Sequence, residues 1–366
     1  MEKIKIAFLG DIMPGGVFQR YGEMISPDAL EVLRSFDLRV GTLECAIGEN
    51  MAFDQEKMEQ KEWRNIIYAK NEAVDRLKYL EIDVVSLANN HIFDLGEEGL
   101  INTMKLLDGC GIKYFGAGLN KREASAPAVI RKKGKTIAFL GYMPFWWEAP
   151  HPAKENSPGI NLLYIDQVIE DIKEAKRIYD YVFVVPHWGL EYSFFPTNRE
   201  KKNATLMIEA GADGVLGSHT HQLQPLIRIK RRPVCFSLGN FAFPDFYIQP
   251  TRPIWYPNKN DDLSAVKIVY NYPEYTEEYL KRVWKRHGRE GMILALTITN
   301  DYIETKRIET FLTTENKIVL KPYCFWTKFV LTILNVCVSY KGYYIVAGLF
   351  YKLYFRLAYF SKNRKA

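Results

Sequence analysis

The chain has 366 residues, of which 48% are hydrophobic and 25% are charged, so it is long enough for one large globular domain or two ordinary ones. Its formal net charge of +6 is concentrated in residues 321–366, which hold eight Lys or Arg and no Asp or Glu. The rest of the chain has 41 basic and 43 acidic residues, a net charge of −2. Such a near-neutral body argues against a nucleic-acid-binding protein.

The first residues run directly into a strand pattern, without the apolar stretch of a signal peptide, so we expect a cytoplasmic protein. Five cysteines, an odd number with no Cys-x-x-Cys pair, are expected to be reduced thiols in the core. Two of the six histidines, His151 and His287, are expected at the surface.

In the first part of the chain, strands and helices alternate. Strands are predicted at 3–9, 37–43, 82–87 and 112–115, and helices at 29–36, 71–80 and 97–107. Ser26 and Pro27 are typical of a helix start, and Asn71 is predicted to cap the second helix. Residues 46–66 are polar and irregular, which indicates a loop.

Hairpins are mixed into the second part of the chain. The pattern predicts hairpins at 128–141, 226–237 and 292–309, strands at 181–185, 213–216 and near 264–269, helices at 166–178, 200–210 and near 276–286, and loops at 143–160 and 238–241. Helices alternating with strands, with hairpins among them, favour an α/β sandwich with mixed sheets over a purely parallel sheet.

Polar side chains that can bind metals follow five of the predicted strands. They are Asp11, Glu44, Asn90, His187, His219 and His221. In α/β proteins, ligands gather outside the carboxyl ends of strands. Imidazoles, carboxylates and one amide oxygen suit Mn, Fe or Zn, and the set is large enough for two ions that share a bridging carboxylate. Taken singly, each residue could instead be a turn, cap or core residue.

Six short motifs, in order, resemble those of the CapA-type capsule-synthesis proteins. They are Gly10-Asp11, Leu43-Glu44, Asn89-Asn90-His91-x-x-Asp94-x-Gly96, His187-Trp188-Gly189-x-Glu191-Tyr192, Gly217-x-His219-x-His221 and Ser237-Leu238-Gly239-Asn240-Phe241. These proteins are associated with poly-γ-glutamate capsule and belong to the calcineurin-like metallophosphoesterase superfamily. The resemblance runs from about residue 3 to about 245. It implies a metallophosphatase-like, four-layer α/β/β/α sandwich in residues 1–310, followed by a helical tail in 311–366.

The resemblance also implies roles for individual residues. Asp11 and His221 would hold one divalent ion, and Asn90, His187 and His219 a second, with Glu44 bridging the two. His91 would be the general acid and Asp94 would orient it. The substrate pocket would include Glu191, Tyr192 and Asn240. Met13 stands where the wider superfamily has a histidine ligand, which leaves the filling of the first site open.

Two functions from different classes remain open. The first is a capsule-biosynthesis enzyme, a metal-dependent hydrolase or transferase, in which a metal-bound hydroxide attacks a phosphoester or an amide or ester bond and His91 protonates the leaving group. Its substrate would be an anionic polymer or a small phosphorylated or amide compound. The second is a non-catalytic capsule-assembly factor, whose partly degraded metal site binds anionic polymer and whose tail meets membrane or partner proteins.

The C-terminal tail is densely aromatic, with 13 Phe, Trp or Tyr among residues 321–366. Residues 329–351 are mostly apolar, and on a helix Lys341, Lys352 and Arg356 would fall within an arc of about 60°. A basic stripe on an aromatic helix is the pattern of a helix lying at a membrane surface, here the inner face. A helical hairpin packed on the catalytic domain or on a second subunit is the alternative.

Overall fold

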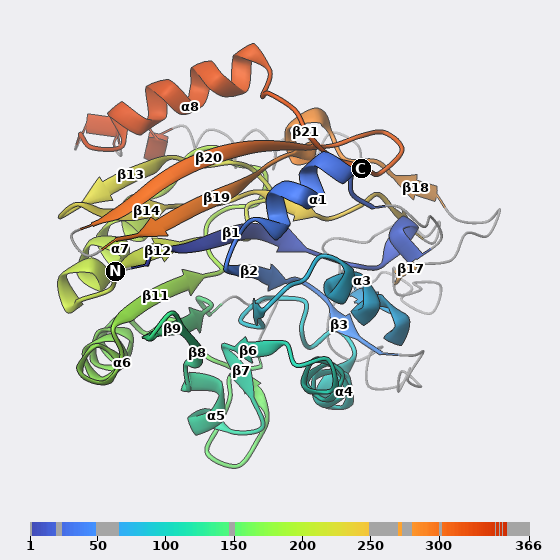
Figure 1. Cartoon of the computed structure of the whole chain (residues 1–366), viewed down its shortest axis with the longest axis horizontal. Coiled ribbons are helices and arrows are strands. Elements are labelled where there is room, and N and C mark those ends of the chain that lie inside the picture. The colour runs from blue at the N-terminus through green and yellow to red at the C-terminus, as the bar shows by residue number, and fades with distance from the viewer. Residues whose placement is uncertain are drawn as a thin grey trace, which may run out of the picture.

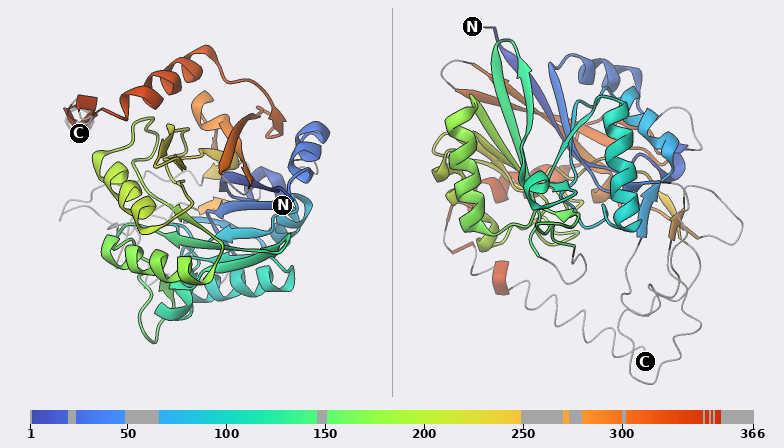
Figure 2. Two further views of the ribbon diagram at one scale, coloured as in Figure 1. Left: turned by 60° about the vertical axis from the view of Figure 1, so that its left-hand side comes forward. Right: turned by 90° about the horizontal axis from the view of Figure 1, so that it is seen from below.

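The computed structural model describes residues 2–19, 24–48, 66–145, 151–248, 270–272, 280–299 and 302–340, together with 342, 343, 345 and 347–349. Two sheets pack face to face, and helices cover the outer face of each (Figures 1 and 2). The predicted four-layer α/β/β/α sandwich with mixed sheets is therefore confirmed.

The first sheet is built around β1 (Ile4–Ile12). Its strand order is β21-β20-β19-β1-β2-β5-β6, and β15 also pairs with β1. The other strands are β2 (Leu38–Leu43), β5 (Val84–Ser86), β6 (Lys113–Phe115), β15 (Asn240–Ala242), β19 (Glu290–Ile298), β20 (Ile303–Leu312) and β21 (Ile318–Leu320). Strands β1, β2, β5, β6 and β15 are parallel, so their carboxyl ends lie on one edge.

The second sheet has the order β13-β14-β12-β11-β9-β8. Its strands are β8 (Ala128–Lys132), β9 (Lys135–Tyr142), β11 (Tyr181–Pro186), β12 (Gly214–Leu216), β13 (Leu226–Ile229) and β14 (Arg232–Cys235). Smaller pairings join β3 (Ala46–Ile47), β4 (Ile66–Ala69), β16 (Phe246–Ile248), β17 (Tyr270–Tyr272) and β18 (Leu280–Arg282), and separately β7 (Ala117–Gly118) and β10 (Gly159–Ile160).

Helices cover the two outer faces through separate apolar clusters. On the first sheet lie α1 (Pro27–Arg34), α3 (Val74–Tyr79) and α4 (Gly96–Gly109), and on the second lie α6 (Ile165–Ile178) and α7 (Asn198–Ala210). A short helix, α5 (Lys121–Ser125), precedes the β8–β9 hairpin. Between the sheets, the ring of Phe8 packs 6.0 Å from that of Phe139 and 5.3 Å from that of Phe183.

Local sequence explains most of these boundaries. Pro27 occupies the first turn of α1 after the extended Ser26, as predicted. Helix α7 begins with a capping box, in which Thr197 and Glu200 satisfy each other's backbone N–H groups. The β8–β9 and β13–β14 hairpins turn at residues with left-handed backbone, Lys133-Gly134 and Lys230-Arg231.

Several sequence predictions were wrong. Residues 240–242 form β15 rather than a loop, because they pair in parallel with the end of β1, with Asn240 opposite Asp11. Residues 280–282 form β18 rather than part of a helix near 276–286, because they pair with β16. Asn71 does not cap a helix but begins a 3₁₀ turn, and its side chain accepts a hydrogen bond from Asn102. The predicted strand near 264–269 lies outside the described residues, as does 49–65 of the predicted polar loop.

The described part of the tail packs on the sandwich. Strands β20 and β21 continue the first sheet across residue 310, and α8 (Phe325–Cys337) then crosses the edges of both sheets (Figure 1). Leu331 joins the core between the sheets, and Asn335 Oδ1 accepts hydrogen bonds from the Leu226 amide and from Arg307. The stripe predicted from Lys341, Lys352 and Arg356 lies outside the described residues. None of the described helices has the length and apolar character needed to cross a membrane.

Candidate metal centre

All six predicted ligands meet where the carboxyl ends of the two sheets adjoin. Asp11 lies at the end of β1, and Glu44 follows β2. Asn90 lies in the turn after β5, His187 follows β11, and His219 and His221 follow β12. The strands deliver these side chains from distant parts of the sequence to one buried place, as the strand pattern predicted.

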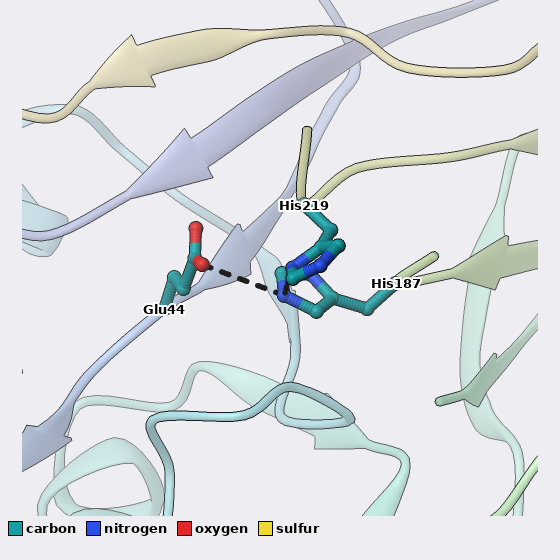
Figure 3. A group of neighbouring side chains, drawn as sticks. All are labelled: Glu44, His187 and His219. Atoms are coloured by element: carbon teal, nitrogen blue, oxygen red, sulfur yellow. Dashed lines mark hydrogen bonds and ion pairs between the residues drawn. The ribbon is translucent and has the colours of Figure 1, made fainter. Parts of the chain in front are cut away.

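The first group of donors surrounds the Nε2 atom of His187 (Figure 3). This atom lies 3.4 Å from Glu44 Oε1, 3.1 Å from His219 Nδ1 and 2.8 Å from Asn90 Oδ1. Two imidazole nitrogens, a carboxylate oxygen and an amide oxygen therefore converge. This set suits a divalent transition metal.

The second group consists of Asp11, Glu44 and His221, whose ligand atoms lie within 4.8 Å of one another. His221 Nε2 is 3.6 Å from Glu44 Oε1, and His221 Nδ1 is 3.7 Å from Asp11 Oδ2. Glu44 Oε1 faces both groups, because it is also the oxygen near His187. The arrangement fits two cation positions that share the Glu44 carboxylate.

The electrostatics of these side chains also fit cations. Among the described residues, no donor forms a hydrogen bond with Glu44 Oε1, Glu44 Oε2 or Asp11 Oδ1, although all three oxygens are buried. Burial raises the pKa of Asp11 to about 7, and burial together with the nearby Asp11 charge holds the pKa of Glu44 well above its usual range. Burial lowers the pKa of His187 well below its usual value and that of His219 to about 3. Both imidazole rings are therefore neutral, the form in which a ring nitrogen can bind a metal.

Hydrogen bonds made by neighbouring residues orient two of the imidazole rings. Ser218 Oγ lies 2.9 Å from His187 Nδ1 and 3.1 Å from Thr42 Oγ1. Asn240 Oδ1 lies 2.9 Å from His221 Nδ1, while its Nδ2 donates to the Gly288 carbonyl at 2.9 Å. An N–H at Nδ1 in each ring places the ring's lone pair on Nε2, the nitrogen that faces Glu44.

The loop after β12 holds a strained backbone. His219 and His221 have φ values of 93° and 52°, a region that non-glycine residues seldom occupy. Asp11 Oδ2 accepts a hydrogen bond from the His219 amide at 3.1 Å, which fixes the strained turn to β1. Strain of this kind persists only where the surroundings enforce it, and it is typical of functional sites.

His91 lies beside the centre in a fixed orientation. Its Nδ1 is 2.6 Å from Asp94 Oδ2, and its amide donates to Asn89 Oδ1 at 3.0 Å. Asn89 in turn donates to the Leu43 carbonyl, next to Glu44. Asp94 Oδ2 also accepts from the Ile67 amide at 2.6 Å, so the carboxylate is anchored to β4. This arrangement holds the His91 ring in one tautomer, with an N–H at Nδ1.

The remaining predicted pocket residues lie around His221. The ring of Tyr192, which is 47% exposed, is 5.8 Å from the His221 ring and 6.3 Å from Trp284. Asn240 is buried against His221, and the charge of the half-buried Glu191 contributes to the raised pKa of Glu44. Met13, by contrast, is buried in the apolar core and supplies no nitrogen ligand.

Sequence reasoning missed two residues of this neighbourhood. Ser218 stood inside the Gly217–His221 motif, and its position directly before the candidate ligand His219 was the available signal. Trp284, which packs 5.1 Å from the His221 ring, had no local signal because it lies far along the chain.

Comparisons with known proteins identify the family of this chain. Residues 5–245 match the family described as "Bacterial capsule synthesis protein PGA_cap". The chain is 31% identical over 248 residues to the PGA biosynthesis protein CapA of Bacillus subtilis, covering 66% of this chain and 64% of that protein. It is 32% identical over 252 residues to the capsule biosynthesis protein CapA of Bacillus anthracis, covering 66% and 60%. The matched region thus spans less than two thirds of either relative.

Among solved structures, a putative 5'-nucleotidase from Staphylococcus aureus is similar with a TM-score of 0.48 and 15% identity, over 93% of this chain and 59% of that one. The family match covers every residue of the candidate metal centre, from Asp11 to Asn240. The chain therefore belongs to the bacterial capsule synthesis protein PGA_cap family.

Proposed function

We propose that the chain acts in capsule biosynthesis as a metal-dependent hydrolase or transferase. Asp11, Glu44 and His221 would hold one divalent ion, and Asn90, His187 and His219, with Glu44 shared, a second. The observation that carries the proposal is a pair of buried carboxylates facing neutral imidazoles, with three of the four carboxylate oxygens lacking a described hydrogen-bond donor. Without cations this arrangement is unfavourable, because buried charge needs a partner.

When bound, such ions lower the pKa of water and polarise a substrate oxygen. The chain's own residues supply the rest. Ser218 and Asn240 hold the imidazoles of His187 and His221 with Nε2 toward Glu44, and the Asp94 carboxylate holds His91. Asp94 occupies the Nδ1 side of the His91 ring, which leaves Nε2 as the atom that would give a proton to a leaving oxygen or nitrogen. The ring is 9% exposed, so a substrate bound at the ligands could reach it.

The bond that is cleaved or transferred would be a phosphoester or an amide or ester in an anionic substrate. A centre of two dications favours ligands with negative charge, and the chain's relatives are named for capsule and PGA biosynthesis. Tyr192, half exposed beside His221, offers a flat wall and a hydroxyl for such a substrate. Manganese, iron and zinc all suit the donor set.

One observation favours a second candidate, a non-catalytic assembly factor that holds an ion or an anionic polymer. Met13 packs in the core where the wider superfamily supplies a histidine, so the Asp11 group has one ligand fewer. Against this candidate stands the hydrogen-bonded His91–Asp94 pair, which a scaffold has little physical reason to keep.

The tail supports a further part of the proposal, contact with an anionic membrane surface. Helix α8 buries Thr327, Leu331 and Leu334 against the sandwich, and it turns Phe325 and Trp326 outward with exposures of 75% and 65%. Together with Phe329 these rings form an exposed aromatic cluster, with ring centroids about 6 Å apart. Residues 321–366 carry eight basic and no acidic side chains, which favours anionic lipid as the partner.

A chromogenic assay tests the catalytic proposal. Purified full-length chain, loaded with Mn²⁺, Fe²⁺ or Zn²⁺, is incubated with bis(p-nitrophenyl) phosphate and with γ-glutamyl-p-nitroanilide. Metal-dependent release of chromophore that His91→Ala reduces by about 10²–10⁴-fold supports the enzyme. Absence of release from both compounds, with metal bound, would favour the assembly factor.

A further inference from the structure

A second cluster of metal-binding side chains lies where α8 begins, outside the centre described above. It consists of His287, Glu290 and Cys324, whose ligand atoms lie within 4.8 Å of one another. His287 and Glu290 belong to the 3₁₀ turn Arg286–Arg289 and the first residue of β19, and Cys324 is the residue before α8. We propose that these three residues bind one zinc ion, which fastens the start of α8 to the sandwich.

The donor set favours zinc. A thiolate, an imidazole and a carboxylate are the zinc ligands of proteins, and three of them with water in the fourth position form an ordinary tetrahedral site. The side chain of His287 is 42% exposed, so water and ions can reach the cluster. The hard-cation alternatives, Mg²⁺ and Ca²⁺, select oxygen ligands and would not use the thiol.

The surroundings already hold the ligands in place. The Glu290 carboxylate is buried and accepts from the Cys324 amide at 3.0 Å and from the Thr327 hydroxyl. His287 Nδ1 lies 3.6 Å from Glu290 Oε2 and 3.3 Å from Thr327 Oγ1, and Cys324 Sγ lies 3.4 Å from that same hydroxyl. The carboxylate keeps lone pairs for a metal, since two of about four are used.

The described basic side chain that pairs with Glu290 makes only a long, exposed contact with it. Arg286 Nε lies 4.0 Å from Glu290 Oε1, and its side chain is 58% exposed, so it screens the buried carboxylate poorly. A bound dication would neutralise Glu290 and the Cys324 thiolate together. It would replace a weak, solvent-exposed contact with two coordinate bonds between segments 34 residues apart.

The proposed zinc ligand His287 is adjacent to a residue that helps to orient a ligand of the main centre. Gly288, next to His287, accepts a hydrogen bond from Asn240 Nδ2, and the Oδ1 atom of the same Asn240 side chain orients the ring of His221. An ion at His287 would therefore stiffen both the start of α8 and the turn behind His221. Neither effect depends on whether the main centre is catalytic.

Cobalt(II) titration of the full-length chain tests the site. Thiolate-bound Co²⁺ gives a near-ultraviolet charge-transfer band, and the donor groups of the main centre contain no thiol. Cys45 lies beside Glu44, but burial holds its pKa well above the usual range, so it stays protonated. We expect the wild type to show the band, saturating at one equivalent beyond those taken by the main centre.

Variants assign the band. Cys324→Ser should abolish it, while Cys337→Ser, which alters a half-buried cysteine at the other end of α8, should leave it unchanged. His287→Gln, a change at a half-exposed side chain that folding tolerates, should weaken Co²⁺ binding at this site at least about tenfold. Absence of the band in the wild type, or its persistence in Cys324→Ser, would overturn the proposal.

Discussion

Replacing Asp11 by Asn should stabilise the metal-free protein. The Asp11 carboxylate is buried, its Oδ1 has no described hydrogen-bond donor, and a second buried carboxylate, Glu44, lies beside it. Asparagine keeps the oxygen that accepts from the His219 amide, and it removes the charge. The gain should depend on pH, because only the ionised carboxylate is costly.

The magnitude follows from the pKa of Asp11, which burial raises from 3.8 to about 7. Below pH 3.8 the residue is protonated in the folded and unfolded states, so it costs nothing. As the pH rises from 3.8 to about 7, the unfolded state ionises first, and folding becomes less favourable. One pKa unit corresponds to about 1.4 kcal/mol, so the full cost at pH 8 is about 4 kcal/mol. We expect Asp11→Asn to gain about 2–4 kcal/mol there and almost nothing below pH 4.

Urea unfolding at pH 8 and pH 4, in the presence of a chelator, measures this difference. Asp213→Asn is the control, because Asp213 is equally buried but lies 2.5 Å from Lys176 Nζ and 3.2 Å from Arg232 Nη2. It should lose stability where Asp11→Asn gains it. Adding Mn²⁺ should stabilise the wild type more than Asp11→Asn, since only the wild type keeps both carboxylates. An Asp11→Asn variant less stable than wild type at pH 8 would refute the reasoning.

Three further outcomes are expected. His91→Ala should lower kcat on the chromogenic substrates by about 10²–10⁴-fold without changing metal content, measured by elemental analysis. Gly10→Ala should lower the free energy of unfolding by about 3 kcal/mol, because an added Cβ would lie 1.8 Å from the Gly239 carbonyl oxygen. Replacing Trp326 and Phe329 together by Ser should weaken binding of the full chain to phosphatidylserine vesicles at least about tenfold, measured by co-sedimentation.

Each of these has a matched control. His151→Ala changes a histidine outside both ligand groups and should keep full activity. Gly109→Ala places a Cβ where nothing lies within 4 Å, so stability should hold or rise slightly. Ile101→Ser removes an exposed apolar side chain on α4 and should leave vesicle binding unchanged. Equal effects in variant and control would contradict the corresponding prediction.

The periodic patterns of helices and strands predicted an α/β sandwich with mixed sheets, while its four-layer arrangement was implied by the resemblance to the capsule-synthesis proteins. The hairpins at 128–141 and 292–309 are local, so turn residues and alternation suffice to predict them. Strands β15 and β18 were missed because each has three residues and owes its form to partners far along the chain, β1 and β16. Such short strands carry no periodicity of their own.

The convergence of the ligands was also predictable, because parallel strands present their carboxyl ends at one edge. What could not be predicted was which atoms orient the rings. The hydrogen bonds that His187 donates to Ser218 and His221 donates to Asn240 depend on the register between segments and on single side-chain rotamers. The cluster of His287, Glu290 and Cys324 was not predicted, because its residues are brought together only by the register between distant segments. From the sequence, His287 was expected to be a surface residue and Cys324 a core thiol.

The metal content of the purified chain tests the central claim most directly. Elemental analysis is performed after loading with Mn²⁺, Fe²⁺ or Zn²⁺, in a Cys324→Ser background so that the second cluster does not contribute. We predict two ions per chain, falling to one or none in His219→Ala. A chain that takes up no ion from any of the three metals, or whose content His219→Ala leaves unchanged, would contradict the assignment of a binuclear centre.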